Sequence, residues 1–322
     1  MSQLGASNLL CESKQLNGQQ KRLKVYRFCH AKNLGGGTRW AQQLLRCVPH
    51  ISVDDISTCD IVVCDDITTN DNEQNEIFVH QTLKLVGTKP TIFFVHDDPE
   101  EPMKLILEQP ASTRHQILMF RTSLVKCFKQ PYERILPSFQ AADNNIKCLQ
   151  PATCSSLHKP KIGFCGVMKY PARRMLCEAF QNNDSFDTIF VERYDFHGHF
   201  TADLQDKHKE QFLAVMNECP YQVCSRGFGN FSHRLYETLA FGRIPIVLDT
   251  QTCFPENLPS SMTDCIVFVR DIKHACSQLL AFHETHDLHD TQRACRKLWE
   301  NFLSFEGFAP FFDAQMHELV AL

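Results

Sequence analysis

Two arginines and a glutamate, Arg226, Arg234 and Glu237, lie close together in the second half of the chain. Arginine stays charged at neutral pH and binds phosphate through two parallel hydrogen bonds, so the pair could hold a diphosphate. On a helix, Arg234 and Glu237 share a face because they are three residues apart. A carboxylate beside a diphosphate can accept hydrogen bonds from ribose hydroxyls. The three side chains predict a nucleoside diphosphate site; an exposed Arg234–Glu237 pair without a ligand is the alternative.

The residues around these charges favour the same interpretation. Gly227 and Gly229 allow the backbone to approach a ligand closely. Ser232 or Asn230 could cap the following helix, whose first amides would attract phosphate. An ordinary turn would use the same glycines. The predicted donor-binding residues are Arg226, Gly227, Gly229, Asn230, Ser232, Arg234 and Glu237.

Short apolar runs that end in polar residues predict the strands that position these side chains. They cover residues 24–30, 59–66, 90–98, 115–120 and 133–139, then 161–167, 186–193, 221–225, 244–249 and 265–270. Such runs are typical of strands buried on both faces of a parallel sheet, and helix-compatible segments lie between them. The alternation predicts an α/β protein with two doubly wound, Rossmann-like domains that face a central cleft.

The length of 322 residues also suits two domains. A polar stretch with two prolines, residues 144–160, predicts the linker between them. We therefore expect a flexible polar tail at 1–20, a first domain at 21–150, a second domain at 151–305, and a segment at 306–322 that packs across both.

The bulk composition excludes several classes. A formal net charge of −4 gives no sign of a nucleic-acid partner. The 16 cysteines are scattered among apolar runs, which favours a reducing compartment over a disulfide framework. Neither a signal-peptide run nor a membrane-spanning run is present, so we expect a soluble, cytoplasmic protein. His283, His286 and His289 drift around a helix and the C-x4-C pairs lack the usual spacing, so no metal site is predicted.

The run "CSRGFGNFSHRLYETLAFGRIPIVLD" (residues 224–249) resembles the signature of the exostosin-like glycosyltransferases, family 47. Weaker resemblance covers residues 161–270. It implies a GT-B fold, a nucleotide-sugar donor in the second domain, an acceptor on the first, and inversion at the anomeric carbon. Family members in eukaryotes are usually anchored in the Golgi, so this chain would be a bacterial or viral type. The α1,3-fucosyltransferase group is similar in its donor motif, but it usually has Tyr-x-x-Glu-Lys where this chain has Tyr236-Glu237-Thr238.

An inverting transferase needs a general base to deprotonate the acceptor hydroxyl. His96, Asp97 and Asp98 directly follow an apolar strand and are the first candidates, with His30, Asp65 and Asp66 also at predicted strand ends. Capping of the next helix is the other role for Asp97 or Asp98. Further substrate contacts are predicted in two loops, at Gly36 and Gly37 and at His197 and His199, although both loops could be plain surface turns.

The sequence thus predicts an inverting hexosyl- or pentosyltransferase that moves a sugar from a UDP- or GDP-linked donor to a hydroxyl of a glycan or glycoprotein. We expect no cofactor or metal, because the two arginines could stabilise the departing diphosphate. The alternatives are a fucosyltransferase-like enzyme and a non-catalytic module that binds a glycan or nucleotide, or that resembles a receiver domain. The sugar, the acceptor linkage and the oligomeric state stay open.

Overall fold

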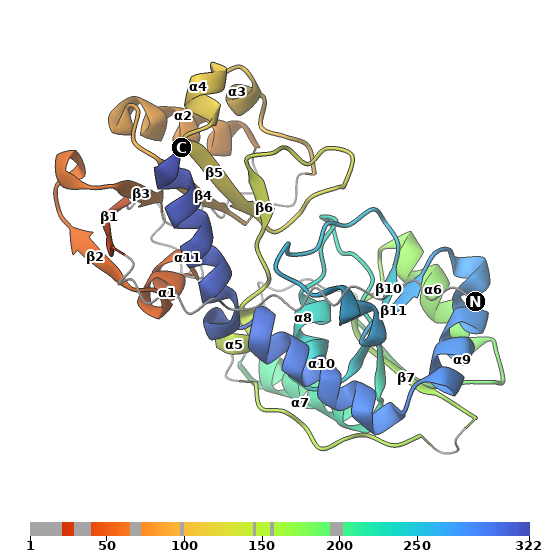
Figure 1. Cartoon of the computed structure of the whole chain (residues 1–322). Helices are drawn as coiled ribbons and strands as arrows, with labels where there is room; N and C mark the ends of the chain where they lie inside the picture. Colours follow the sequence, from red (N-terminus) through yellow and green to blue (C-terminus); the bar gives the residue numbers. More distant parts are fainter. Residues whose placement is uncertain are drawn as a thin grey trace, which may run out of the picture.

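The structure is a computed structural model that describes residues 21–28, 40–64, 72–96, 100–143, 146–154, 158–193 and 202–322. The first part of the chain forms a six-stranded parallel sheet (Figure 1). In spatial order its strands are β2 (His50–Val53), β1 (Leu23–Phe28), β3 (Ile61–Cys64), β4 (Thr91–Val95), β5 (Ile117–Arg121) and β6 (Glu133–Ile135). Helices α1 (Trp40–Cys47), α2 (Asn72–Val86), α3 (Lys104–Leu107) and α4 (Ala111–Arg114) belong to the same part, and α5 (Gln140–Asp143) packs through Ala141 in the core of the second part.

The second part forms a five-stranded parallel sheet in the order β11 (Val267–Val269), β10 (Ile244–Leu248), β9 (Tyr221–Val223), β7 (Lys161–Val167) and β8 (Asp187–Arg193). Its helices are α6 (Pro171–Gln181), α7 (Ala202–Glu218), α8 (His233–Ala240), α9 (Ala275–Thr285) and α10 (Leu288–Phe302). Gly163 in β7 allows α7 to lie close, because a Cβ there would be 2.7 Å from the side chain of Val215. Gly242 follows α8 with a φ of 68°, a conformation that glycine adopts without strain at the end of a helix.

Both sheets are covered on two faces. Successive residues of a strand point to opposite faces, and Ile61 and Val63 of β3 pack in a core with α1, whereas Val62 and Cys64 pack in a core with α2. In the second sheet, Phe164 packs with α6, α8 and α10, while Cys165 packs with α7. The chain therefore contains two doubly wound α/β domains in series, the arrangement of the GT-B fold, as the sequence predicts.

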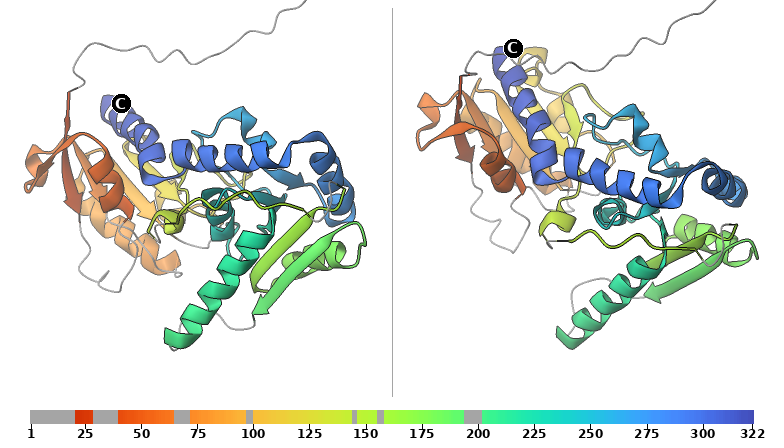
Figure 2. Two further views of the ribbon diagram at one scale, coloured as in Figure 1. Left: turned by 90° about the horizontal axis from the view of Figure 1, so that it is seen from below. Right: turned by 60° about the horizontal axis from the view of Figure 1, so that its bottom comes forward.

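The chain returns to the first domain at its end (Figure 2). Helix α10 packs in the core of the second domain, whereas α11 (Phe305–Ala321) packs in that of the first. Phe305 stacks on Phe139 with ring centroids 4.2 Å apart. Gly307 allows the tight turn between the two helices, because a Cβ there would lie 2.3 Å from the carbonyl oxygen of Glu300. The limits of the four predicted segments stay predictions.

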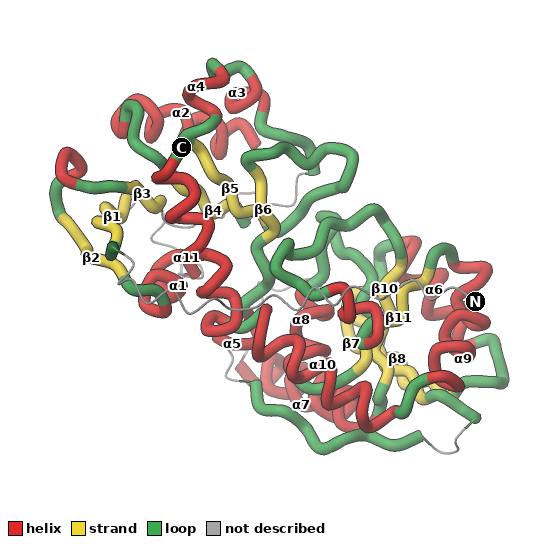
Figure 3. The backbone as a smooth tube through the Cα atoms, in the orientation of Figure 1, coloured by secondary structure: helices red, strands yellow, loops and turns green. Residues whose placement is uncertain are grey.

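Loops (Figure 3) make part of the contact between the two domains, together with α5, which packs against α8. Val125 and Thr252 form an isolated antiparallel bridge, and the amide of Lys126 donates to the carbonyl oxygen of Gln251 at 2.9 Å. Among the described residues, no helix combines the length and the apolar character needed to cross a membrane.

Candidate functional site

A cavity of about 870 Å³ lies at the carboxyl ends of β7, β8 and β9. Its wall includes Cys165 and Val167 at the end of β7, Arg193 at the end of β8, and Ser225 after β9. The first turns of α6 and α8, one side of α7, and residues around 140–149 of the connection between the domains complete the described lining. This is the edge at which doubly wound sheets bind ligands.

The cavity is strongly cationic, and we call it the cationic cavity. Its described lining has five basic side chains: Lys147, Arg173, Arg193, Lys209 and Arg234. Glu237 is the single carboxylate among the described lining residues. Phe164, Tyr170, Phe212, Phe231 and Phe241 supply aromatic surface. An excess of positive charge beside aromatic rings suits an anion that carries a planar group.

Arg234 is held near the carboxyl end of β7. Its Nη2 donates to the carbonyl oxygen of Cys165 at 2.7 Å, and its guanidinium lies 4.1 Å from the ring centroid of Phe212. The Nε is 3.7 Å from a carboxylate oxygen of Glu237, which is too long for a strong hydrogen bond. The buried Nη1 has no hydrogen-bond partner among the described residues. The position of Arg234 is therefore fixed while part of its hydrogen-bonding capacity is unused.

Two further arginines are tied to the same strand ends. Arg173, in the first turn of α6, donates to the carbonyl oxygens of Val167 at 2.7 Å, Ser225 at 3.0 Å and Arg226 at 2.9 Å. Arg193 donates through Nη2 to the carbonyl oxygen of His208 at 2.5 Å. The Nε of each of these arginines and the hydroxyl of Ser225 are buried without a hydrogen-bond partner in the described part of the chain.

The charge of Arg234 also repels those of Arg173 and Arg193. Burial lowers the pKa of Arg173 and of Arg193 below the ordinary value, and the charge of Arg234 acts in the same direction on both. A lowered pKa of a cation means that the folded protein holds the charge at a cost. An anion in the cationic cavity would remove part of that cost.

Four predicted donor residues line the cationic cavity: Gly227, Ser232, Arg234 and Glu237. Ser232 is the N-cap residue of α8, but its side chain makes no capping hydrogen bond. The amide of Gly227 donates to the carbonyl oxygen of Phe231 at 3.1 Å, and that of Phe231 to Gly229 at 2.8 Å, so the glycines close a tight loop before the helix.

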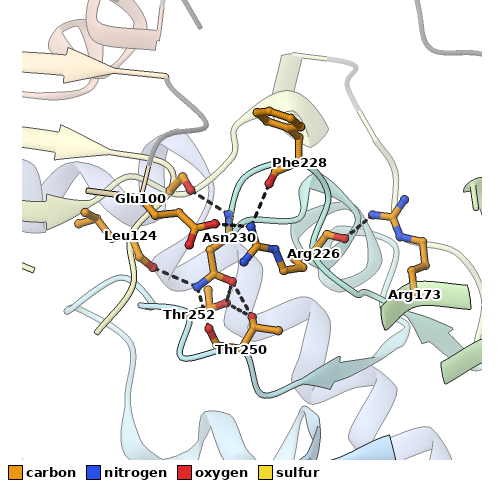
Figure 4. Close-up of polar contacts among 9 residues, drawn as sticks. Glu100, Leu124, Arg173, Arg226, Phe228, Asn230, Thr250 and Thr252 are labelled. Atoms are coloured by element: carbon orange, nitrogen blue, oxygen red, sulfur yellow. Dashed lines mark hydrogen bonds and ion pairs between the residues drawn. The ribbon is translucent and has the colours of Figure 1, made fainter. Parts of the chain in front are cut away.

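Arg226 and Asn230 lie outside the described lining and make the contact between the domains (Figure 4). Arg226 forms an ion pair with Glu100 of the first domain and donates to the carbonyl oxygen of Phe228 at 2.9 Å. The amide of Asn230 donates to Ser123 Oγ at 2.9 Å. The structure therefore separates Arg226 from the place where the sequence analysis puts it, beside Arg234 on one diphosphate.

The side chain of Asn230 is fully buried and its hydrogen bonds are satisfied. Its Nδ2 donates to the carbonyl oxygens of Thr250 at 2.9 Å and of Leu124 at 3.5 Å, and its Oδ1 accepts from the hydroxyls of Thr250 and of Thr252. We call the contacts of Arg226 and Asn230 with the first domain and with residues 250–252 the interdomain contact.

The predicted base lies at the carboxyl end of β4. His96 directly follows this strand, and its ring lies 4.3 Å from that of Trp40. Asp97 and Asp98 are outside the described residues, as are Asp65, Asp66, His30, Gly36, Gly37, His197 and His199. The N-cap residue of α3 is Met103. Within the described ranges, no group of three or more metal-ligating side chains is placed to hold an ion.

Arg173 and Arg193 are the site residues that the sequence analysis missed. A signal was present, since Arg193 ends a predicted strand and Arg173 begins a predicted helix. Both positions belong to the carboxyl edge of the sheet, where the predicted ligand lies.

Comparisons with known proteins concern the architecture. No family model and no curated protein matches the chain. Among solved structures, the apo form of the lipopolysaccharide outer core galactosyltransferase WaaB covers 90% of this chain and 99% of its own, at 10% identity and a TM-score of 0.47. Sucrose-phosphate synthase from Thermosynechococcus elongatus covers 82% of this chain and 74% of its own, at 12% identity and a TM-score of 0.42. A UDP-N-acetylglucosamine 2-epimerase covers 88% of this chain and 96% of its own, at 10% identity and a TM-score of 0.32.

These findings correct the family expected from the sequence. The resemblance to the exostosin-like glycosyltransferases is wrong, because no family model matches the chain and the solved structures it matches are of other kinds. The structure gives a physical reason for the misleading motif. Asn230 and Arg226 join the domains, and Arg243 is buried and donates to the carbonyl oxygens of Met216 at 2.6 Å and Gln150 at 2.9 Å. Much of the motif therefore positions backbone segments.

Proposed function

We propose that the chain is a glycosyltransferase that binds a nucleotide-diphosphate sugar in the cationic cavity and transfers the sugar to a hydroxyl of a glycan acceptor. The observation that carries this proposal is the cluster of Arg173, Arg193 and Arg234 at the carboxyl edge of a parallel sheet, with Glu237 as the single described carboxylate in the wall. A diphosphate is the anion that such a cluster suits, because each guanidinium offers paired donors to phosphate oxygens.

The three arginines would act together on the donor. In the free protein their charges oppose one another, and a diphosphate would offset that repulsion when it binds. As the bond to the sugar breaks, negative charge grows on the departing diphosphate, and fixed cations at that position lower the barrier. That no metal is needed stays part of the proposal, as does inversion at the anomeric carbon.

Glu237 would hold the ribose. It lies one helical turn from Arg234 on α8, and its side chain is 13% exposed, within reach of a ligand in the cationic cavity. A carboxylate there accepts hydrogen bonds from two adjacent hydroxyls. The general base would come from His96 or from Asp97 and Asp98 at the carboxyl end of β4.

The test is a thermal-shift series with UDP, GDP and their sugar conjugates on the full chain. A ligand that binds only the folded state raises the melting temperature, by an amount that grows with its concentration. We expect either the uridine or the guanosine nucleotides to raise the melting temperature of the wild type, and most of this increase to be lost in Arg234→Gln. Arg293→Gln, on the exposed face of α10, is the matched control. Equal shifts in wild type and Arg234→Gln, or no shift with any nucleotide, would refute the donor site.

A transfer assay then separates binding from catalysis. The donor that shifts the melting temperature is incubated with the protein and with a panel of glycan acceptors, and release of the nucleoside diphosphate is measured. Acceptor-dependent release supports the transferase. Tight nucleotide binding without release from any donor would favour a binding module instead.

A further inference from the structure

A second cavity, of about 490 Å³, lies in the first domain. Its wall includes Ile117, the first residue of β5, and Tyr132, the residue before β6. It is thus at the amino ends of these parallel strands, the edge opposite to the one that carries ligands in doubly wound sheets. Arg114 at the end of α4 and Gln315 on α11 close its sides.

Tyr132, one of the residues that line this cavity, carries a buried hydroxyl without a partner among the described residues. Tyr132 is only 9% exposed, and its hydroxyl makes no hydrogen bond with the described part of the chain. Burial, and to a smaller extent the charge of Glu133, raise the pKa of Tyr132 to about 12, while the charges of Arg114 and Arg121 act in the opposite direction. The hydroxyl therefore stays protonated at neutral pH and can donate a hydrogen bond. Buried polar groups are rarely left unpaired without a reason.

Two arginines line the same cavity. Arg134 is positioned by Gln315, whose Oε1 accepts from its Nε at 2.6 Å, and by the carbonyl oxygen of Pro131, which accepts from Nη1 at 2.7 Å. The side chain of Arg114 makes neither a hydrogen bond nor an ion pair with the residues that the structure describes. Glu318 accepts a hydrogen bond from Gln315 at 2.8 Å. Positive charge beside a hydroxyl donor suits an anionic group.

The rest of the wall is apolar. Ile117, Leu118 and Leu319 are buried and contribute hydrophobic surface. A volume of this size is in the range of sites that enclose small organic ligands. We infer that this second cavity binds a small amphipathic anion, a carboxylate or phosphate monoester joined to an apolar body, with Tyr132, Arg114 and Arg134 on the anionic group. The inference does not depend on the proposed function.

The experiment measures binding of short probes to the full chain by isothermal titration calorimetry. Hexyl phosphate and heptanoate are the test ligands, and hexan-1-ol and hexylamine carry a similar apolar body without the negative charge. All titrations use the Arg234→Gln variant, which weakens competing binding in the cationic cavity. At least one anion should bind about tenfold or more tightly than hexan-1-ol, and the better of the two identifies the head group.

Two substitutions locate the binding. Tyr132→Phe and Arg114→Gln should each lower the affinity for the better-bound anion by about tenfold. Arg293→Gln, on the distant helix α10, should leave this affinity unchanged. Equal affinity for the anion and hexan-1-ol, or an unchanged affinity in Tyr132→Phe, would overturn the inference. Tyr132→Phe should also melt at the same temperature as its parent or higher, because the hydroxyl has no partner to lose in the described part of the chain. A clearly lower melting temperature would mean that the hydroxyl is used by the fold, and would equally overturn the inference.

Discussion

Asn230 and Arg234 are four residues apart and belong to two regions with opposite hydrogen-bonding states. In the interdomain contact, the buried Asn230 side chain uses its donors and its acceptor on Leu124, Thr250 and Thr252. In the cationic cavity, Arg234 has a buried Nη1 and Arg173 and Arg193 each have a buried Nε that find no hydrogen-bond partner among the described residues. The polar side-chain atoms of Asn230 are paired within the protein, whereas several buried donors of the cationic cavity have no partner in the described part of the chain.

The difference separates residues that stabilise the fold from residues that we propose bind a ligand. Satisfied polar groups stabilise a unique arrangement, whereas unpaired buried donors and clustered like charges cost stability. Such a costly cluster at the carboxyl edge of a sheet is typical of a functional site. Substitutions in the two regions should therefore have opposite signatures, with stability lost in one and affinity lost in the other.

The largest effect is expected at the interdomain contact. Asn230→Ala empties a fully buried position and removes the hydrogen bonds of Asn230 with the half-buried hydroxyls of Thr250 and Thr252 and with the carbonyl oxygens of Leu124 and Thr250. We expect the free energy of unfolding to fall by about 2–4 kcal/mol, measured by urea denaturation. Ser232→Ala is the control and should change it by less than about 0.5 kcal/mol, because the Ser232 side chain makes no capping hydrogen bond. Equal effects of the two substitutions would contradict the comparison.

The next effect is expected in the cationic cavity. Arg234→Gln removes a charged donor that would bind the diphosphate. It should weaken the binding of UDP or GDP by about 10- to 150-fold, the equivalent of roughly 1.5–3 kcal/mol of binding free energy. The ligand-free protein should melt at nearly the same temperature, because the lost contacts are offset by less repulsion on Arg173 and Arg193. Calorimetric titration and thermal melting of the same samples measure both. A large loss of stability with unchanged affinity would place Arg234 with the scaffold.

Glu237→Gln sharpens the comparison inside the cationic cavity. The substitution removes the single carboxylate of the described lining, so inorganic pyrophosphate should bind as tightly as before or a few-fold more tightly. The affinity for a nucleoside diphosphate should fall by about five- to tenfold, because the ribose hydroxyls lose a charged acceptor. The two affinities are measured side by side. Parallel changes for both ligands would exclude a contact between Glu237 and the ribose.

The smallest effect is expected at Arg226. Its ion pair with Glu100 is partly exposed, so Arg226→Gln should lower the free energy of unfolding by at most about 1 kcal/mol. The affinity for nucleoside diphosphates should stay within twofold of the wild type, because Arg226 is outside the described lining of the cationic cavity. A loss as large as that of Arg234→Gln would show that Arg226 moves to the ligand.

The sequence is informative where the structure is locally determined. The strand at 161–167 has the predicted limits, because a continuous apolar run, typical of a strand buried on both faces, can be recognised in the sequence without knowledge of its neighbours in the sheet. The edge strand β2 was not predicted, since it is half exposed and has no such run. Within the motif, Arg234 and Glu237 line the cavity as their spacing suggests. The roles of Arg226 and Asn230 depend on Glu100 and Ser123, more than a hundred residues away, and no local pattern contains that information.

The most direct test of the cationic cavity is a crystal structure of the full chain with bound UDP or GDP, whichever raises the melting temperature more. We predict density for the diphosphate between Arg173, Arg193 and Arg234, within hydrogen-bond distance of at least two guanidinium groups, and the ribose beside Glu237. A nucleotide found elsewhere, or a diphosphate held by Arg226 with the three arginines unoccupied, would contradict the account.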